Sequence, residues 1–328
     1  MLKLLRSLLD TYTLLLFAMI LLASLWPAEG QAEVVMTWVT RLAIALLFFL
    51  QGARLSRRAI WDGILHWRLH LLAFAFTFIG FPLLGLAFWP LYQPLLGESL
   101  ALGVLYLCVL PGTVQSAIAF TALARGNLAA AVCNASASSL IGILITPLLV
   151  WLLLGLDTSA AGFSFFDTLK GVSLQLLLPF ITGHGLRPWV ANWVEQNRSW
   201  LGRVDQTSIL LVVYTAFSAS VVAGLWQTIA LERLLLLTLF CSLLLALVLW
   251  LTTQLARRLG FNRQDEIALV FCASKKSMAT GVPLAQLLFS AHLLGPMLLP
   301  LMIFHQIQLM VGAHLAKAYL KQAETKNP

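Results

Sequence analysis

Two adjacent lysines, Lys275 and Lys276, lie in one of the most apolar stretches of the chain, FCASKKSMATGVPLAQLLF, which begins at Phe271. A charge near the centre of a bilayer costs roughly 2.5 to 3.5 kcal/mol even on lenient insertion scales. An ammonium group there either gives positive charge to a cavity for an anion or fills the place of a bound cation. The alternative is that this segment is shorter than its apolar run and that both lysines extend to the membrane surface.

The composition of the chain is that of a membrane protein. Of the 328 residues, 60% are hydrophobic and 10% are charged, whereas soluble proteins carry about 25% charged residues. The net charge of +8 lies in short stretches between apolar segments, which argues against a nucleic-acid partner. The four cysteines fall in apolar segments without CxxC spacing, so we expect neither disulfides nor metal ligands.

Ten apolar segments follow one another, each bounded by charged residues, Gly or Pro. Because a backbone in lipid must pair its polar groups internally, each segment is expected to be a transmembrane helix. The fold class predicted is therefore an all-α polytopic membrane protein. The expected spans are approximately 11–26, 34–51, 69–89, 99–123, 128–154, 167–186, 206–225, 232–255, 266–290 and 293–316. The first of them faintly imitates a cleavable signal peptide, and we interpret it as uncleaved.

The connections between these segments alternate in charge. Of the 21 Lys and Arg residues, 16 fall on one side, which also holds both termini. Basic connections stay in the cytoplasm by the positive-inside rule. We therefore expect a multi-pass membrane protein with both termini cytoplasmic.

Two segments are interrupted at matching places, about half a chain apart. Segment four contains Pro111-Gly112, and segment nine contains Gly281-Val282-Pro283. Proline has no N–H donor and clashes with the preceding turn, so each site predicts a broken helix. The match predicts two inverted five-helix repeats, residues 1–156 and 157–328, with broken helices four and nine crossing. Ordinary kinks are the alternative at either site.

Breaks inside a membrane require a protein-lined cavity, and the N-termini of half-helices favour an anion. Thr113 and Ser116 are candidate caps in segment four, as are Ser277 and Thr280 in segment nine. The polar run CNASASS of segment five borders the same cavity or serves helix packing. No carboxylate lies deep in a segment to pair with the lysines. The predicted substrate-binding residues are Pro111, Gly112, Thr113, Gln115, Ser116, Asn134, Ser138, Lys275, Lys276, Ser277, Thr280 and Gly281.

Two long stretches carry a resemblance to a known family. PGTVQSAIAFTALARGNLAAAVCNASASSLIGILITPLL and FCASKKSMATGVPLAQLLF, with the ten-segment pattern, resemble the bile acid:sodium symporter family, and most closely its divergent bacterial branch. The likeness covers essentially the whole chain, strongly in these stretches and only in hydrophobicity elsewhere. It implies a core domain of spans three to five and eight to ten, and a panel domain of spans one, two, six and seven. It also implies a substrate site between these domains, with access alternating by core movement.

The resemblance places the family's sodium ligands near Ser116, Ala131, Ala135, Ser274 and Met278. The family's glutamate in span nine falls near Ser274, and no carboxylate is close. Sodium needs oxygen ligands, so we predict a degenerate sodium site and no confident metal site. Our hypothesis is that Lys275 or Lys276 supplies the charge that sodium supplies in other members.

The expected function is secondary active transport of an organic anion, of bile-acid, steroid or carboxylate type, by alternating access without sodium or a cofactor. The alternatives are a sodium-coupled symporter with a rearranged site and a non-transporting regulatory membrane protein. The coupling ion, sodium or proton, stays open. Paired aspartates and HExxH are missing from the sequence, so we do not expect an enzyme. The expected partners are the small organic anion and the lipid bilayer.

Overall fold

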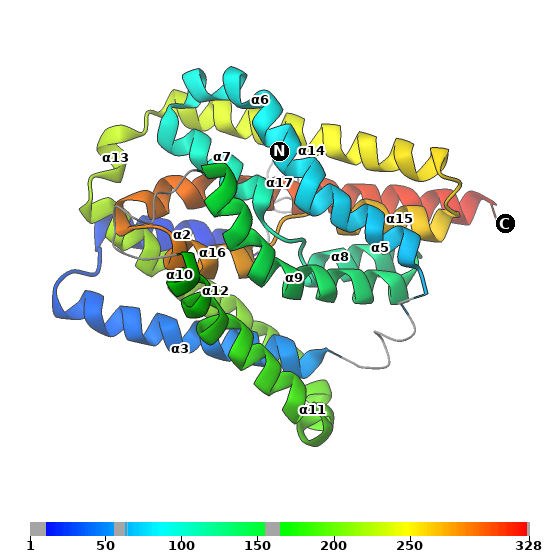
Figure 1. The fold of residues 1–328 in the computed structure, drawn as a ribbon, viewed down its shortest axis with the longest axis horizontal. Coiled ribbons are helices and arrows are strands. Elements are labelled where there is room, and N and C mark those ends of the chain that lie inside the picture. The colour runs from blue at the N-terminus through cyan, green and yellow to red at the C-terminus, as the bar shows by residue number, and fades with distance from the viewer. Residues whose placement is uncertain (1–10, 56–62, 64, 155–164, 327–328) are drawn as a thin grey trace. The chain divides into compact units, whose positions relative to one another are not determined.

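The computed structural model describes residues 11–55, 63, 65–154 and 165–326, and these residues form helices and connecting turns without a strand (Figure 1). The all-helical prediction is confirmed. Contacts along the chain divide it into two compact units. The first comprises Met1–Leu55, Leu156–Ala230 and Val282–Leu298, and the second comprises Ser56–Gly155, Leu231–Gly281 and Leu299–Pro328.

The first unit is built mainly from paired long helices. α3 and α11 approach most closely at two glycines: a Cβ atom on Gly52 would overlap the carbonyl oxygen of Phe180, and one on Gly183 would overlap that of Phe49. Small residues let membrane helices pack this tightly. The described helices of this unit are α2 (Thr11–Leu25), α3 (Gln31–Arg54), α10 (Phe165–Val172), the π-helix η3 (Ser173–Leu177), α11 (Leu178–Gln196), α12 (Arg198–Val222) and α13 (Leu225–Thr228).

The second unit holds most of the interrupted helices. Its described elements are α5 (Trp67–Ala75), the π-helix η1 (Phe76–Gly80), α6 (Phe81–Leu96), α7 (Glu98–Val109), α8 (Gln115–Leu123), α9 (Leu128–Leu154), α14 (Leu231–Arg258) and α15 (Arg263–Ala273). Two further helices belong to both units. α16 (Met278–Leu288) passes from one to the other after Gly281, and α17 (Ala291–Lys326) does so after Leu298.

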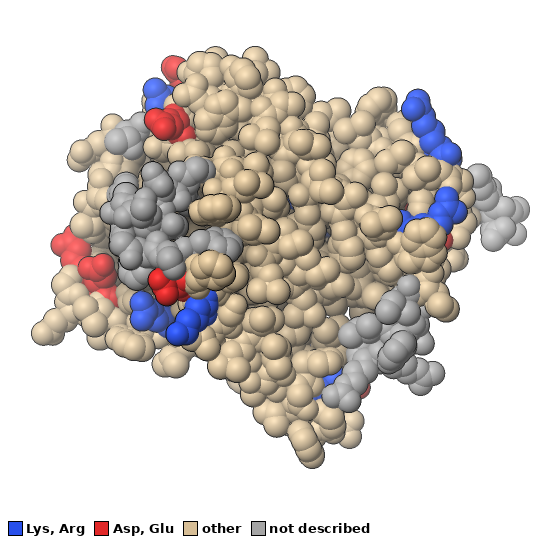
Figure 2. Space-filling view, in the orientation of Figure 1, with Lys and Arg blue, Asp and Glu red and all other residues tan. Residues whose placement is uncertain are grey.

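Within the described ranges, six stretches of helix are long and apolar enough to cross a membrane: Gln31–Arg54, Trp67–Leu96, Leu128–Leu154, Arg198–Val222, Leu231–Arg258 and Leu293–Ala323. The stripe of exposed leucines on α14 repeats every four residues, so it lies on one face of the helix. Its members are Leu231, Leu235, Leu239 and Leu243, each more than half exposed. On the face drawn in Figure 2, charged side chains gather in a few patches and most of the surface is uncharged. Lipid, rather than water, suits such a surface, and the chain is a multi-pass membrane protein.

Each of the ten predicted segments overlaps one described helix or a run of two or three consecutive helical elements, although the ten-span count and the inverted repeat stay predictions. The break predicted in segment four is confirmed, because α7 ends at Val109 and α8 begins at Gln115. The break predicted at Gly281-Val282-Pro283 is wrong. These residues lie inside α16, and the interruption is at residues 274–277 instead.

The displaced break has a physical reason. A proline within a helix removes a single backbone hydrogen bond, and membrane helices tolerate that loss. Residues 274–277 leave the helical path where hydrogen bonds from elsewhere in the second unit satisfy the backbone groups of Lys276 and the N–H of Ser277, as described below. Those partners are distant in the sequence, so the local Gly and Pro signals do not locate the break.

Candidate functional site at the two helix breaks

The break between α7 and α8 leaves the carbonyl groups of residues 108 to 111 without partners inside a helix. The Val109 carbonyl accepts a hydrogen bond from Thr146 Oγ1 of α9 at 3.0 Å. The Pro111 carbonyl accepts one from the Ser277 N–H at 2.8 Å, so the two breaks touch each other. The remaining two carbonyls accept from a lysine.

That lysine is Lys276, whose side chain fills this break as a built-in cation. Its Nζ donates to the carbonyls of Thr77 at 2.9 Å, Cys108 at 2.8 Å and Leu110 at 2.7 Å. An ammonium has three N–H donors, and all three are used. The Phe81 ring lies 4.1 Å from Nζ, and the residue is 0% exposed. Because a helix C-terminus carries partial negative charge, the ammonium neutralises the end of α7.

The Thr77 carbonyl is available because the backbone around it forms a π-helix. The Phe81 N–H bonds to the Phe76 carbonyl, five residues earlier, rather than to that of Thr77. The following residue is Pro82, which has no N–H to offer. One carbonyl is thus freed beside the lysine, which agrees with the frequent placement of π-turns at functional sites.

The second break is held by Gln308 of α17. Gln308 Oε1 accepts from the Lys276 N–H at 2.8 Å, and Gln308 Nε2 donates to the Lys276 carbonyl at 2.9 Å. One buried amide therefore satisfies both backbone groups of the lysine. α16 then starts with Ser277 as its N-cap, because Ser277 Oγ accepts from the Thr280 N–H at 3.2 Å.

Lys275 is also buried, at 2% exposed, but has different surroundings. Its Nζ donates to the Gln308 carbonyl at 3.3 Å and lies 4.6 Å from the Phe120 ring centroid and 5.4 Å from that of Phe271. Among the described residues, neither lysine forms an ion pair with a carboxylate. The alternative that both lysines extend to the membrane surface is therefore wrong.

α9 presents small residues to the first break. A Cβ atom on Gly142 would lie 2.5 Å and 2.6 Å from ring atoms of Pro111, closer than such atoms approach in proteins. Ser138 Oγ accepts from the Gly112 N–H at 3.1 Å. The close approach of α9 therefore depends on a glycine and a serine one turn apart.

The breaks bring together nine of the predicted site residues, and all nine are buried: Pro111, Gly112, Thr113, Ser138, Lys275, Lys276, Ser277, Thr280 and Gly281. Three lie differently. Gln115 is exposed, Ser116 is half-buried, and Asn134 bonds to His70 of α5 instead of to a break. The predicted capping of α8 is wrong, because Thr113 and Ser116 bond to each other through their hydroxyls and no side chain caps that helix.

Three contributors were not predicted as site residues: Gln308, the Thr77 carbonyl and Tyr106, whose hydroxyl donates to the Gly281 carbonyl at 2.6 Å. The short polar run of His305, Gln306 and Gln308 in an otherwise apolar span is a signal that could have identified Gln308. The Thr77 carbonyl has only the nearby Pro82 as a signal, and Tyr106 has none.

Comparison with known proteins identifies the family. The profile of the SBF-like CPA transporter family matches residues 10–321. The chain belongs to this family. The predicted resemblance to bile acid:sodium symporters is confirmed, and this family member is a symporter-like transporter rather than an enzyme.

Several relatives cover nearly the whole of this transporter. "Uncharacterized protein PA2026" of Pseudomonas aeruginosa is 58% identical over 97% of this chain and 95% of its own. "Putative symporter YfeH" of Escherichia coli is 53% identical over 96% of this chain and 94% of its own. "Sodium/bile acid cotransporter 7" of Mus musculus is 30% identical over 84% and 82%, respectively.

Three of the five positions that the resemblance assigns to sodium ligands, Ala131, Ala135 and Met278, carry no side-chain oxygen, and the Ser116 hydroxyl bonds to that of Thr113. Ala131 and Ala135 belong to a buried apolar cluster rich in alanine, and Met278 is buried as well. The Ser274 hydroxyl is buried without a hydrogen-bond partner among the described residues, and it is a single neutral oxygen. A hard cation needs several oxygen ligands, and the three carbonyls nearby are taken by Lys276.

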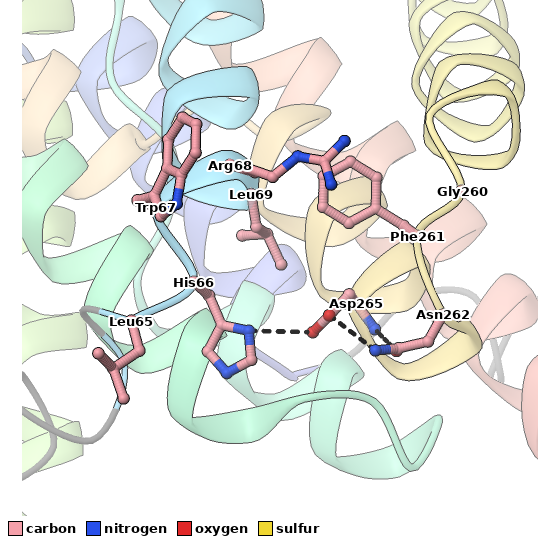
Figure 3. A pocket seen from close by; sticks show the side chains of 9 residues that line it. All are labelled: Leu65, His66, Trp67, Arg68, Leu69, Gly260, Phe261, Asn262 and Asp265. Atoms are coloured by element: carbon pink, nitrogen blue, oxygen red, sulfur yellow. Dashed lines mark hydrogen bonds and ion pairs between the residues drawn. The ribbon is translucent and has the colours of Figure 1, made fainter.

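A second polar cluster lies in a pocket of about 270 Å³ between the starts of α5 and α15, where Figure 3 shows the His66 ring facing the Asp265 carboxylate. His66 Nδ1 is 3.6 Å from Asp265 Oδ1, and Asn262 Nδ2 donates to Asp265 Oδ2 at 2.8 Å. Asn127 Nδ2 donates to Asp265 Oδ1 at 2.7 Å, and Asn127 caps α9. The cluster thus joins the starts of three helices, away from the breaks.

Proposed function

We propose that this protein is a secondary active transporter that moves an organic anion across a bacterial inner membrane by alternating access, and that it does so without sodium. The observation that carries the proposal is the coordination of Lys276 Nζ by three backbone carbonyls. This arrangement is how a protein holds a small cation, yet here the cation is covalently part of the chain. Of the two roles open to the lysines, these contacts favour the tethered cation.

A tethered cation changes how transport is driven. A bound sodium ion can leave with the substrate, whereas Lys276 stays, so its charge cannot be coupled to a sodium gradient. Its charge still supports anion binding, because it offsets the negative end of α7 and leaves the N-termini of α8 and α16 as the positive ends at the breaks. We propose that these N-termini, with Thr113, Gln115, Ser116, Ser277 and Thr280, hold the anionic group.

The substrate class rests on the relatives. The name of the mouse relative, "Sodium/bile acid cotransporter 7", supports an anion with a large apolar body. Because the identity is 30%, this relative supports a class of substrate rather than a particular compound. We propose a steroid-like or other amphipathic carboxylate or sulfonate.

The proposed architecture has ten spans in two inverted five-helix repeats, with a panel of spans one, two, six and seven and a core of the rest. The grouping of Met1–Leu55 with Leu156–Ala230 in one compact unit supports the panel, and the second unit contains the proposed spans three to five. Movement of the core would alternate access. The distribution of basic residues supports cytoplasmic termini.

Counterflow in proteoliposomes tests the proposed function. Purified protein is reconstituted with taurocholate inside, and uptake of labelled taurocholate is measured in sodium buffer and with sodium replaced by choline. We expect saturable uptake that is the same in both buffers. Steep activation by sodium would contradict the proposed sodium independence. If neither taurocholate nor a panel of simpler carboxylates showed saturable counterflow, the proposal that the protein is a carrier would be wrong.

Two variants connect the assay to the site. Lys276→Met is nearly isosteric and removes the tethered cation, so we expect uptake to fall at least tenfold. Lys275→Met removes one long hydrogen bond from a neighbouring ammonium and serves as the matched control, with uptake within about twofold of the wild type. Equal uptake by both variants would contradict the assigned role of Lys276.

A further inference from the structure

A second pocket, whose lining shares no residue with the two breaks, carries an independent inference. It has a volume of about 760 Å³ and lies at the ends of four helices of the second unit, α8, α14, α15 and α17. Its polar lining consists mainly of Arg125, Arg257, Arg263, Glu266, Tyr319 and Gln322. Because α8, α14 and α17 end there and α15 begins there, we place the pocket at a membrane surface and not within the apolar core.

The charges in the pocket do not balance. Glu266 is buried at 4% exposed and accepts from Arg263 Nη1 at 2.7 Å and from Arg257 Nε and Nη2, both at 3.3 Å. Arg263 also lies over the Tyr319 ring at 4.4 Å, so its guanidinium is held in place. Among the side chains that the structure describes in this pocket, one carboxylate faces three guanidinium groups, and two positive charges are left over.

Arg125 supplies the third guanidinium from an unfavourable backbone position. Its φ is +56°, and it is the sole non-glycine residue with positive φ in the described part of the chain. The Gly126 N–H bonds to the Thr121 carbonyl and the Arg125 N–H to the Ala122 carbonyl, which is the Schellman ending of α8. Glycine is the usual residue at this left-handed position, and other residues there are strained.

The backbone strain at position 125 indicates that the arginine side chain itself is needed there. A glycine would remove the strain, and the only thing lost would be the guanidinium side chain. Arg125 is exposed and has no acidic partner among the described residues. Backbone strain that persists at a polar, concave site points to a ligand. The side chain that the strain retains is a guanidinium, whose planar fork matches phosphate oxygens.

We propose that this pocket binds a phosphate group, carried by the head group of an anionic phospholipid or by a soluble phosphorylated compound. Two uncompensated positive charges suit a phosphate better than a single carboxylate. Basic pockets at the ends of membrane helices bind anionic head groups, and Arg257 and Arg263, fixed by Glu266, present a preformed half of the site. This site is separate from the breaks and does not depend on the transported substrate.

Ligand-dependent stabilisation of the detergent-purified protein tests the proposal. The probes are short-chain phosphatidylglycerol, phosphatidylcholine with the same chains, and inorganic phosphate against sulfate. A selective effect of phosphatidylglycerol assigns the lipid source, and a selective effect of inorganic phosphate assigns a soluble one; either supports the site. No stabilisation by phosphatidylglycerol beyond phosphatidylcholine, together with none by phosphate beyond sulfate, would overturn it.

Arg125→Gly is the decisive variant because it removes the guanidinium and relieves the backbone. We expect an unchanged or higher melting temperature without ligand, and an affinity for the stabilising probe about tenfold weaker, as expected for a lost charge-assisted hydrogen bond. Arg258→Gln removes a neighbouring charge that does not line the pocket, and wild-type affinity is expected. Wild-type affinity in Arg125→Gly, or equal losses in both variants, would contradict the site.

Discussion

At the scale of single residues, the buried lysines differ in what their loss would leave behind. Removing the Lys276 ammonium leaves three buried carbonyls without a donor, and each unsatisfied buried group costs about 1 to 3 kcal/mol. Removing the Lys275 ammonium leaves one carbonyl and two phenyl rings, against which a thioether packs well.

We therefore predict that Lys276→Met lowers the free energy of unfolding by at least about 3 kcal/mol. Lys275→Met should change it by no more than about 1 kcal/mol. Thermal unfolding in detergent, followed by intrinsic fluorescence, measures both. A larger loss in Lys275→Met than in Lys276→Met would contradict the assigned contacts.

Gln308 gives a second prediction at this scale. Gln308→Leu keeps the approximate volume but leaves the N–H and the carbonyl of Lys276 unpaired in a buried site. The expected loss is about 2 to 5 kcal/mol of unfolding free energy, from two unsatisfied groups. The control is Gln196→Leu on an exposed position of α11, which should be nearly neutral in the same unfolding assay. Two similar melting temperatures would show that the amide does not support the break.

Sequence reasoning identified the lysines as unusual because their cost is a property of residue type and surroundings. It left open whether they were buried, and it did not predict Gln308. The partners of Lys276 explain why: two are carbonyls near one helix end and one is a carbonyl in a π-helix. Any residue type can supply a backbone carbonyl, so a site built from carbonyl groups cannot be recognised from residue types in the sequence.

At the scale of helices, proline located one break and misled at the other. Pro111 lies in the first break, where its missing N–H and its ring end α7. Pro283 lies inside α16, and the true interruption is set by Gln308 and by the contact of Ser277 with Pro111. Local Pro and Gly residues predict where a helix can break, whereas hydrogen bonds to residues distant in the sequence determine where it does break.

The packing of α9 against the first break gives a prediction for whole elements. Gly142→Ala places a methyl group against the Pro111 ring, and overpacking of this kind costs about 1 to 3 kcal/mol. Gly202→Ala in α12 is the control, because nothing lies within 4 Å of its Cβ position, and alanine should stabilise the helix by about 0.5 to 1 kcal/mol. Opposite shifts in melting temperature are expected. A stabilised Gly142→Ala would mean that α9 does not contact the break as described.

At the scale of the whole molecule, the hydrophobic pattern predicted the helical elements well because lipid imposes one rule on every span. The expected segment 128–154 coincides with α9, and 232–255 lies within α14. Hydrophobicity does not show which way a helix crosses, so the ten-span topology rests on the basic residues.

Impermeant thiol labelling in intact cells tests that topology. The native cysteines Cys108, Cys133, Cys241 and Cys272 are all buried, so they should give a low background without being replaced. Glu33 and Lys321 are exposed on α3 and α17, and the positive-inside rule places them on opposite sides of the membrane. We expect Glu33→Cys to be labelled in intact cells and Lys321→Cys to be labelled only after the cells are broken. Labelling of both variants in intact cells would place the C-terminal helix end outside, and then the two five-span halves could not be related by inversion with both termini in the cytoplasm.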